Sequence, residues 1–212
     1  MSIEKFNPFP IDVYKISCSG HEKIKEYLMK HVYDDFEKNG PNGGLQQIYT
    51  DYLPGTGKMV HWPFMYNLYA EDVKNVLTEI GFDVSQFDIR LKGWYNFTTG
   101  NSEEWVHDHV GGASTINYSF VHYITIDDSA NGTVFLNPNY KMIRSVSPTK
   151  NINYLPKCFF DERMQIPVQE GDILFFPSWL DHTAPQHTSG NLRITNAVNV
   201  MMRLKNHDED GF

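Results

Sequence analysis

Three histidines in two short motifs are the residues of this sequence whose types and spacing best suit metal chemistry. His107 and His109 flank Asp108 in the run 105–109, and His182 ends the run 175–182. Side chains of an extended strand repeat every second residue, so His107 and His109 are predicted to share one face. His182 follows an apolar predicted strand, and we expect it to complete the site from a distant part of the chain.

An arginine and a threonine near the third histidine could bind an anionic ligand. Imidazole, with or without a carboxylate, is a ligand set expected for Fe(II) and similar ions, and open coordination positions permit oxygen chemistry. Arg193 follows His182 in a β-rich run, and Thr195 has the same strand parity as Arg193. A buried guanidinium donates a bidentate pair to a carboxylate, and a neighbouring hydroxyl adds a third bond. The sequence therefore predicts a metal site beside a receptor for a ligand carboxylate.

The first part of the chain is predicted to be helical. With 212 residues, 41% hydrophobic and 14% aromatic, the chain is long enough to bury one substantial core. Apolar residues recur at helical spacing from Gly20 to about Lys38 and again from about Ala70 to Ile80, where Gly81 can end the helix. Two amphipathic helices are therefore expected to precede the histidine motifs.

After Gly81, short β-rich runs separated by turns replace the helical pattern. The predicted strands are 89–97, 114–126, 133–136, 165–168, 173–176 and 192–202, and a further half-buried strand, 11–16, precedes the first helix. This order favours an α+β or mainly-β fold in which antiparallel sheets close on themselves and the helices support one face. We expect a single domain, 1–212, in which residues 1–85 form N-terminal helical and loop support.

Composition argues against several functional classes. Lys and Arg number 18 against 26 Asp and Glu, and the net charge of -8 removes the main electrostatic term of nucleic-acid binding. No apolar run approaches the roughly 18 residues that a membrane span needs, and residues 1–5 show no signal pattern. Cys18 and Cys158 lack metal-site spacing and are expected to be reduced thiols. We expect a cytoplasmic protein without a nucleic-acid or membrane partner.

The order of several motifs resembles that of the 2-oxoglutarate/Fe(II)-dependent oxygenases. The matching segments fall between about residues 90 and 200: 94–96, 107–109, 118–124, 132–138, 171–182 and 193–199. More narrowly, the chain resembles a small branch, common in tailed phages and marine bacteria, that carries H-x-H where many relatives carry H-x-D. The N-terminal ninety residues resemble the family only loosely.

This resemblance implies a fold, a cofactor and a co-substrate. The implied fold is a double-stranded β-helix (jelly-roll or cupin-like) over residues 86–204, with Fe(II) at one end of the barrel and O2 as the oxidant. The co-substrate 2-oxoglutarate would chelate the metal through its 2-oxo acid end, and its far carboxylate would meet Arg193 and Thr195. Tyr95, Asn96 and Tyr123 are further candidates for hydrogen bonds to it. A phage-encoded member would act in the host cytoplasm.

The identity of the third metal ligand is open between two neighbouring residues. The family's common triad is two histidines and one carboxylate, whereas strand parity selects His107, His109 and His182 and turns Asp108 to the opposite face. A local β-bulge would turn Asp108 inward instead. We favour His109, with Asp108 as the alternate. Three histidines would leave the iron with a higher net charge.

The function favoured by these features is hydroxylation. Such an enzyme activates O2, decarboxylates 2-oxoglutarate to succinate and hydroxylates a C–H bond of an unknown prime substrate, either a peptide or a small molecule. Two alternatives stay open: a cupin-like three-histidine dioxygenase or isomerase that needs no 2-oxoglutarate, and a non-catalytic jelly-roll module such as a phage structural or binding domain. Residues 45–65, rich in Gly and aromatics, would suit a lid. The sequence does not indicate the oligomeric state.

Overall fold

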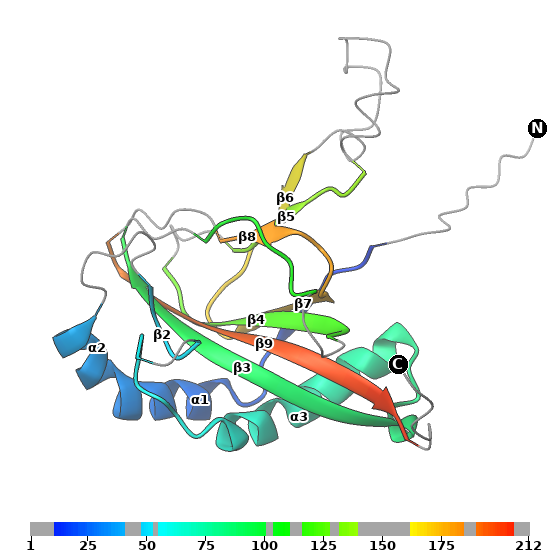
Figure 1. Cartoon of the computed structure of the whole chain (residues 1–212), viewed down its shortest axis with the longest axis horizontal. Helices are drawn as coiled ribbons and strands as arrows, with labels where there is room; N and C mark the ends of the chain where they lie inside the picture. The colour runs from blue at the N-terminus through cyan, green and yellow to red at the C-terminus, as the bar shows by residue number, and fades with distance from the viewer. Residues whose placement is uncertain are drawn as a thin grey trace, which may run out of the picture.

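Two antiparallel sheets form the body of the molecule (Figure 1). The computed structural model describes residues 11–40, 48–52, 55–100, 104–110, 116–127, 132–139, 162–184 and 190–205. Parts of the segment expected to be a lid, 45–47 and 53–54, lie outside these residues, as does Cys158. In the described part of the chain, no helix has the length and hydropathy that crossing a bilayer requires.

The larger sheet has six strands. Their order is β1 (Tyr14–Ser17), β7 (Asp172–Pro177), β4 (Tyr118–Thr125), β9 (Leu192–Leu204), β3 (Phe87–Thr99) and β2 (Ile48–Thr50). The smaller sheet has the order β6 (Arg163–Gln165), β5 (Val134–Leu136) and β8 (His182–Thr183). These strands confirm the predicted runs 11–16, 89–97, 114–126, 133–136, 173–176 and 192–202. The run 165–168 is wrong, because β6 ends at Gln165 and residues 166–168 are not strand. The short strands β2 and β8 lie outside the predicted runs.

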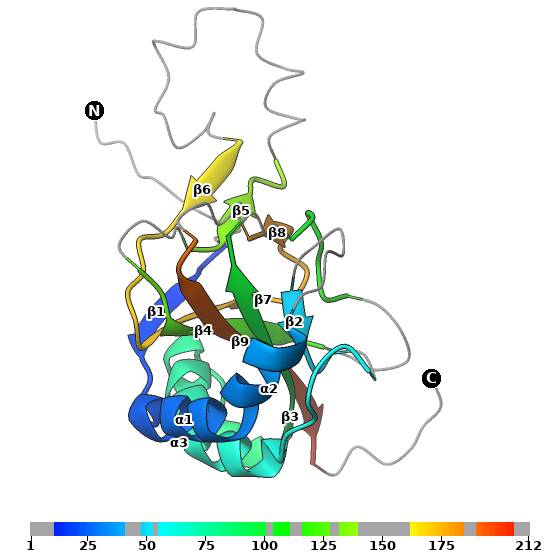
Figure 2. The same ribbon diagram turned by 90° about the vertical axis from the view of Figure 1, so that its left-hand side faces the viewer.

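Helices cover one face of the larger sheet, and the smaller sheet lies on its other side (Figure 2). The first helical region comprises α1 (His21–Leu28), a π-helical turn (Met29–Tyr33) and α2 (Asp34–Asn39). It is followed by α3 (Trp62–Ile80) and a 3-10 turn (Val84–Gln86). The N-terminal part supplies more than helical and loop support, since β1 and β2 are edge strands of the larger sheet.

The second helix begins earlier than predicted. Its C-terminal end at Ile80 agrees with the prediction, and Gly81 adopts the left-handed conformation, with φ of 109°, that ends it. Its start lies at Trp62 rather than near Ala70, because Pro63 suits a first helical turn and Trp62 is anchored by tertiary contacts. The Trp62 indole donates to the buried Asp51 carboxylate at 2.7 Å, and the same carboxylate accepts from the backbone N–H of Tyr95 at 3.0 Å.

The two longest strands, β3 and β9, divide the interior into two sides. They pair along their whole length, from Phe87 opposite Leu204 to Thr99 opposite Leu192. Side chains on one side, such as Phe97, Ile194 and Val198, pack with the helices in the main core. Contact with the helices is close: a Cβ at Gly93 would lie 2.6 Å from the Trp62 ring. Side chains of the alternate residues face the opposite side of the sheet, where the histidine motifs lie.

A chain of polar side chains is buried on the helix side of the sheet. His122 of β4 is fully buried, its Nδ1 lies 2.8 Å from the Tyr69 hydroxyl, and its Nε2 lies 3.1 Å from Nδ1 of His21. Asn196 of β9 donates to the same Tyr69 hydroxyl at 2.8 Å. Burial, together with repulsion from His21, lowers the pKa of His122 to about 3. His122 is therefore neutral at pH 7 and connects β4 with α1 and α3.

The neutral state of His122 predicts acid-sensitive stability. Because its pKa is lower in the folded chain than the value of about 6.5 in an unfolded chain, the unfolded chain binds the proton first, and stability falls as pH decreases from about 6.5 toward 3. Glutamine cannot titrate, so we expect the free energy of unfolding of His122→Gln to fall less steeply with decreasing pH than that of the wild type. The two slopes should differ by about 1.4 kcal/mol per pH unit between pH 6 and 4. Urea unfolding at each pH measures this difference. The matched control is His31→Gln, at an exposed helix position, which should follow the wild-type slope. Equal slopes for His122→Gln and the wild type would contradict the prediction.

Candidate metal and co-substrate site

Backbone hydrogen bonds join the two histidine motifs. The N–H of His107 donates to the carbonyl of His182, and the N–H of His182 donates to the carbonyl of His107, both at 3.0 Å. A third bond, from the N–H of His109 to the carbonyl of Ser178 at 2.9 Å, continues the contact. The segment 104–110 is thereby aligned with β8 and the turn before it, although these residues are far apart in sequence.

This alignment brings the three histidine side chains together. The imidazole centroids of His107 and His182 lie 4.5 Å apart, those of His109 and His182 lie 5.0 Å apart, and those of His107 and His109 lie 5.3 Å apart. One nitrogen from each ring lies within 4.8 Å of the others. Among the described residues, this is the grouping of possible ligand side chains with the geometry to hold a metal ion.

The other nitrogen of two of these rings is held by a neighbouring carbonyl. Nδ1 of His107 lies 2.7 Å from the carbonyl oxygen of Trp105, and Nδ1 of His182 lies 2.8 Å from that of Leu180. A carbonyl oxygen can only accept, so each Nδ1 carries the proton and each Nε2 keeps a free lone pair. This is the tautomer in which Nε2 can bind a metal, and the second bond fixes the ring orientation.

Burial keeps the imidazoles of His109 and His182 in the neutral form that a metal requires. It lowers the pKa of His182 to about 3, and repulsion from His107 and His109 acts in the same direction. Burial also lowers the pKa of His109, against the opposing effect of the Asn199 hydrogen bond. Metal ligation needs neutral imidazole, so these rings do not have to lose a proton near pH 7 before binding an ion.

Asp108 lies outside the histidine cluster. Its side chain is exposed, and its carboxylate accepts a hydrogen bond from the N–H of Val110 at 2.9 Å, which is a local turn contact. The carboxylate is not part of the cluster of three imidazole nitrogens, although Asp108 also lines the cavity described below. The geometry therefore favours His109 over Asp108 as the third ligand.

The histidines open into a cavity of about 740 Å³ between the segment 104–110 and the sheet. Arg193 and Thr195 of β9 line it, and both are largely buried. In the described part of the chain, Nε of Arg193 has no hydrogen-bond partner. A buried donor without a partner is costly unless a ligand satisfies it. The arrangement fits a dicarboxylate with one end near the histidines and the other at Arg193.

The remaining predicted co-substrate residues are divided between three environments. Asn96 lines the cavity, and its amide donates to the Glu104 carboxylate at 3.1 Å. Tyr123 is fully buried behind the cavity wall, where its hydroxyl contacts the Thr133 hydroxyl at 2.8 Å. Tyr95 lies on the helix side of β3, and its hydroxyl donates to the carbonyl of Lys58 at 2.6 Å. The placement of Tyr95 does not fit the co-substrate role expected for it, because neighbouring residues of a strand face opposite sides.

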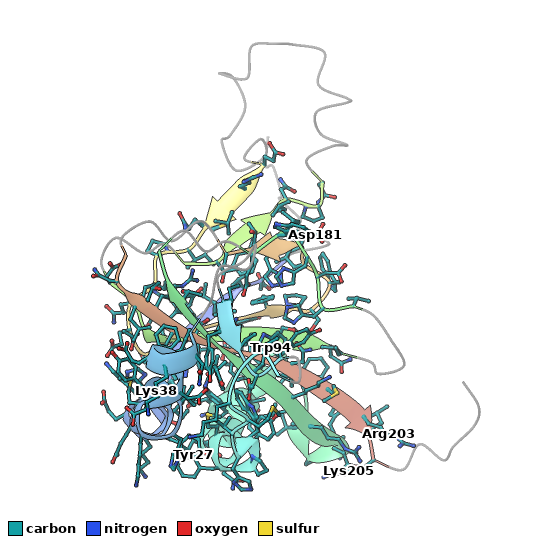
Figure 3. The ribbon with its side chains drawn as sticks, turned by 60° about the vertical axis from the view of Figure 1, so that its left-hand side comes forward. Tyr27, Lys38, Trp94, Asp181, Arg203 and Lys205 are labelled. Carbon is teal, nitrogen blue, oxygen red and sulfur yellow. The ribbon has the colours of Figure 1, made fainter. Side chains whose placement is uncertain are left out.

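Several residues in or beside the cavity had no role assigned from the sequence. Asn199, which lines the cavity, and the buried Ser119 contact the ring of His109. Glu104, which also lines the cavity, contacts Asn96. Trp94 packs beside His109 with ring centroids 5.6 Å apart, and Figure 3 shows it on β3 in the middle of the molecule. Strand parity could have indicated Asn199, which has the same parity as Arg193 and Thr195. Ser119 and Glu104 carried no comparable signal.

Comparisons with known proteins identify the family and the fold. A model of a 2OG-Fe(II) oxygenase family matches residues 92–199, half of the chain. No curated protein sequence matches. A solved prolyl-4-hydroxylase from Pseudomonas putida is similar at 10% identity and a TM-score of 0.56, with 91% of this chain and 94% of that chain covered. HygX from Streptomyces hygroscopicus, solved with nickel and 2-oxoglutarate bound, gives 13% identity, a TM-score of 0.53 and coverage of 90% and 82%.

A third structure is an oxidoreductase of the 2OG-Fe(II) oxygenase family from Burkholderia pseudomallei. Its identity is 12% and its TM-score 0.50, with 68% of this chain covered, and this chain spans 57% of its length. Identities this low show the fold alone. The shared fold is the double-stranded β-helix, which confirms the mainly-β architecture expected from the sequence.

Metal binding by single-alanine variants would distinguish His109 from Asp108. Loss of an outer hydrogen-bond partner typically weakens metal binding about 10- to 100-fold. We expect His109→Ala to weaken Co(II) binding by more than this, because one of the three clustered nitrogens is lost. The adjacent control, Asp108→Ala, should leave the dissociation constant near the wild-type value. Calorimetric titration of metal-free protein measures both. Weaker binding by Asp108→Ala with unchanged binding by His109→Ala would reverse the assignment.

Proposed function

We propose, since this chain belongs to the 2OG-Fe(II) oxygenase family, that it is a hydroxylase whose Fe(II) is held by His107, His109 and His182. The observation that supports this proposal most directly is that a three-histidine cluster and Arg193 line the same cavity, and that the buried Nε of Arg193 has no hydrogen-bond partner among the residues that the structure describes. The His107-Asp108-His109 motif further supports membership of the H-x-H branch of tailed phages and marine bacteria. Its prime substrate is a peptide or a small molecule.

The residues at one end of the cavity bind the metal, and those at the other end bind the co-substrate carboxylate. Nε2 of each histidine holds the metal, while the Nδ1 contacts prevent the rings from turning. Arg193 donates to the distal carboxylate of 2-oxoglutarate, and the Thr195 hydroxyl donates a further bond. Because both are largely buried, water competes weakly for that carboxylate.

The chemistry itself belongs to the bound groups. Fe(II), held by His107, His109 and His182, would supply the oxidation. O2 and 2-oxoglutarate would give succinate and CO2, with one oxygen atom entering succinate and the other entering a C–H bond of the prime substrate. The contribution of the protein is orientation and exclusion of water. Trp94 and Val121 line the cavity and provide apolar surface around the reacting groups.

An anaerobic titration tests this proposal without knowledge of the prime substrate. Fe(II) is added to metal-free protein, and 2-oxoglutarate follows. We expect the visible metal-to-ligand charge-transfer band that bidentate chelation produces, and succinate release once O2 is admitted. Bound iron without the band or succinate would favour the cupin-like alternative, which needs no 2-oxoglutarate. A protein that retains no metal would favour a non-catalytic module.

Arg193 is expected to set the affinity for the co-substrate. Arg193→Ala removes a buried charged donor, so the dissociation constant for 2-oxoglutarate should rise about 10- to 100-fold, whereas metal content should stay near wild type. The charge-transfer band, titrated anaerobically, gives this constant. Arg203→Ala is the matched control, since Arg203 is exposed at the far end of β9 (Figure 3), and it should behave as wild type. Unchanged co-substrate affinity in Arg193→Ala would refute the assigned role.

A further inference from the structure

The ring of His109 is held differently from those of the other two histidines. His107 and His182 each bond a carbonyl two residues earlier in the chain. Nδ1 of His109 instead lies 2.5 Å from Oδ1 of Asn199, a side chain of β9 that is 90 residues away in sequence. The orientation of this one ring therefore depends on tertiary contacts rather than on a carbonyl of its own segment.

Asn199 belongs to a buried polar chain. Its Oδ1 accepts a hydrogen bond from the Ser119 hydroxyl at 3.0 Å, and this hydroxyl lies 2.9 Å from Nδ1 of His109. The Ser178 hydroxyl, 2.9 Å from that of Ser119, extends the chain, and the Ser178 carbonyl accepts from the His109 backbone. Ser119 and Ser178 are almost fully buried, and Asn199 is 7% exposed. The three side chains come from β9, β4 and the turn before β8.

Counting protons in this chain identifies the tautomer of His109. The Oδ1 of Asn199 has no hydrogen and can only accept, so the hydrogen in its contact with His109 must come from Nδ1. The Ser119 hydroxyl donates to the same oxygen. Nε2 then keeps the lone pair. If the amide were rotated, its NH2 group would face Nδ1, the proton would move to Nε2, and that nitrogen could no longer bind a metal.

We propose that Asn199 is a positioning residue that holds His109 in its Nδ1–H tautomer and aims Nε2 at the metal. This inference rests on the proposed function, because it assigns Asn199 a role toward the iron site. Outer hydrogen-bond partners of this kind typically contribute about 10- to 100-fold to metal affinity. Oδ1 of Asn199 accepts a hydrogen bond from Ser119 and faces the side chain of residue 109. An imidazole N–H at position 109 can donate to this oxygen, whereas a carboxylate there would place two acceptor oxygens against each other. Asn199 therefore matches histidine at position 109.

Variants at two asparagines of β9 test the proposal. Asn199→Leu has nearly the same size but cannot accept a hydrogen bond. Asn199→Asp keeps an acceptor and serves as the conservative rescue. Asn196→Ala is the matched control: it removes an amide from the same strand, but on the helix side, where that amide bonds Tyr69. Co(II) dissociation constants of the metal-free proteins are measured by calorimetry, and thermal unfolding reports stability.

The expected results separate positioning from general destabilisation. Asn199→Leu should raise the Co(II) dissociation constant about 10- to 100-fold, and Asn199→Asp should bind at least as tightly as wild type. Asn196→Ala should unfold at a lower temperature but keep the wild-type constant. In 15N–1H spectra of metal-free protein, His109 should be protonated at Nδ1 in wild type and Asn199→Asp, and should shift toward the Nε2–H tautomer in Asn199→Leu.

Two outcomes would overturn the proposal. One is a folded Asn199→Leu protein that binds Co(II) as wild type does, and the other is a wild-type His109 protonated at Nε2. The tautomer measurement on wild type needs no variant, so it decides the question even if Asn199→Leu fails to fold. A wild-type protein that does not bind Co(II) would contradict the proposed function itself, whereas wild-type binding with an unaffected Asn199→Leu variant contradicts this inference alone.

Discussion

The two hydrogen bonds exchanged by the backbones of His107 and His182 are the constraint on which the site depends. They align two segments that are more than seventy residues apart in sequence, and the further bond from His109 to Ser178 fixes their register. A slip of one residue in a strand pairing turns the side chains to the opposite face. Here such a slip would turn His107 and His109 away and bring Asp108 inward, so the register of a short bridge determines which residues can bind a metal.

The same principle operates along β9, which serves the cavity and the core at once. Arg193, Thr195 and Asn199 face the cavity, whereas Ile194 and Val198 pack against the helices. Arg193 and Asn199 are therefore positioned by the packing of their neighbours on the other side of the strand. A core substitution that shifts β9 should affect metal and co-substrate sites together, because one rigid element carries residues of both.

In the proposed site, three neutral histidines bind a divalent iron, so the positive charge of the ion must be compensated by other groups. Three imidazoles leave the charge of the divalent ion uncompensated, whereas the family's common carboxylate would offset one unit. In the proposed function the 2-oxo acid end of 2-oxoglutarate supplies negative charge at the metal, and Arg193 neutralises the other end. Metal and co-substrate binding should accordingly support each other more strongly than in a site with a carboxylate ligand.

Local patterns in the sequence determined much of this protein. Alternation and helical spacing were sufficient for most of the strands and for the end of α3 at Ile80, since these features depend on neighbours a few residues away. They were not sufficient for the short strands β2, β6 and β8. Histidines at alternate positions, followed by His182 and Arg193, indicated the residues that the cavity brings together. The division into N-terminal support and a core over 86–204 stays a prediction.

Only the tertiary structure decided the rest, because it depended on contacts between distant segments. Helix α3 begins at Trp62, whose indole is held by a hydrogen bond to Asp51. No local sequence pattern predicts this contact. Tyr95 and Asn96 are neighbours on one strand, so they cannot both face the cavity, and the sequence did not say which face was inside. The tautomers of His107 and His182 follow from carbonyls two residues away, but that of His109 follows from Asn199. The hydrogen bond of His109 joins the segment 104–110 to β9 and exists only once the fold brings the two together. For that reason the sequence alone could not predict the orientation of this histidine.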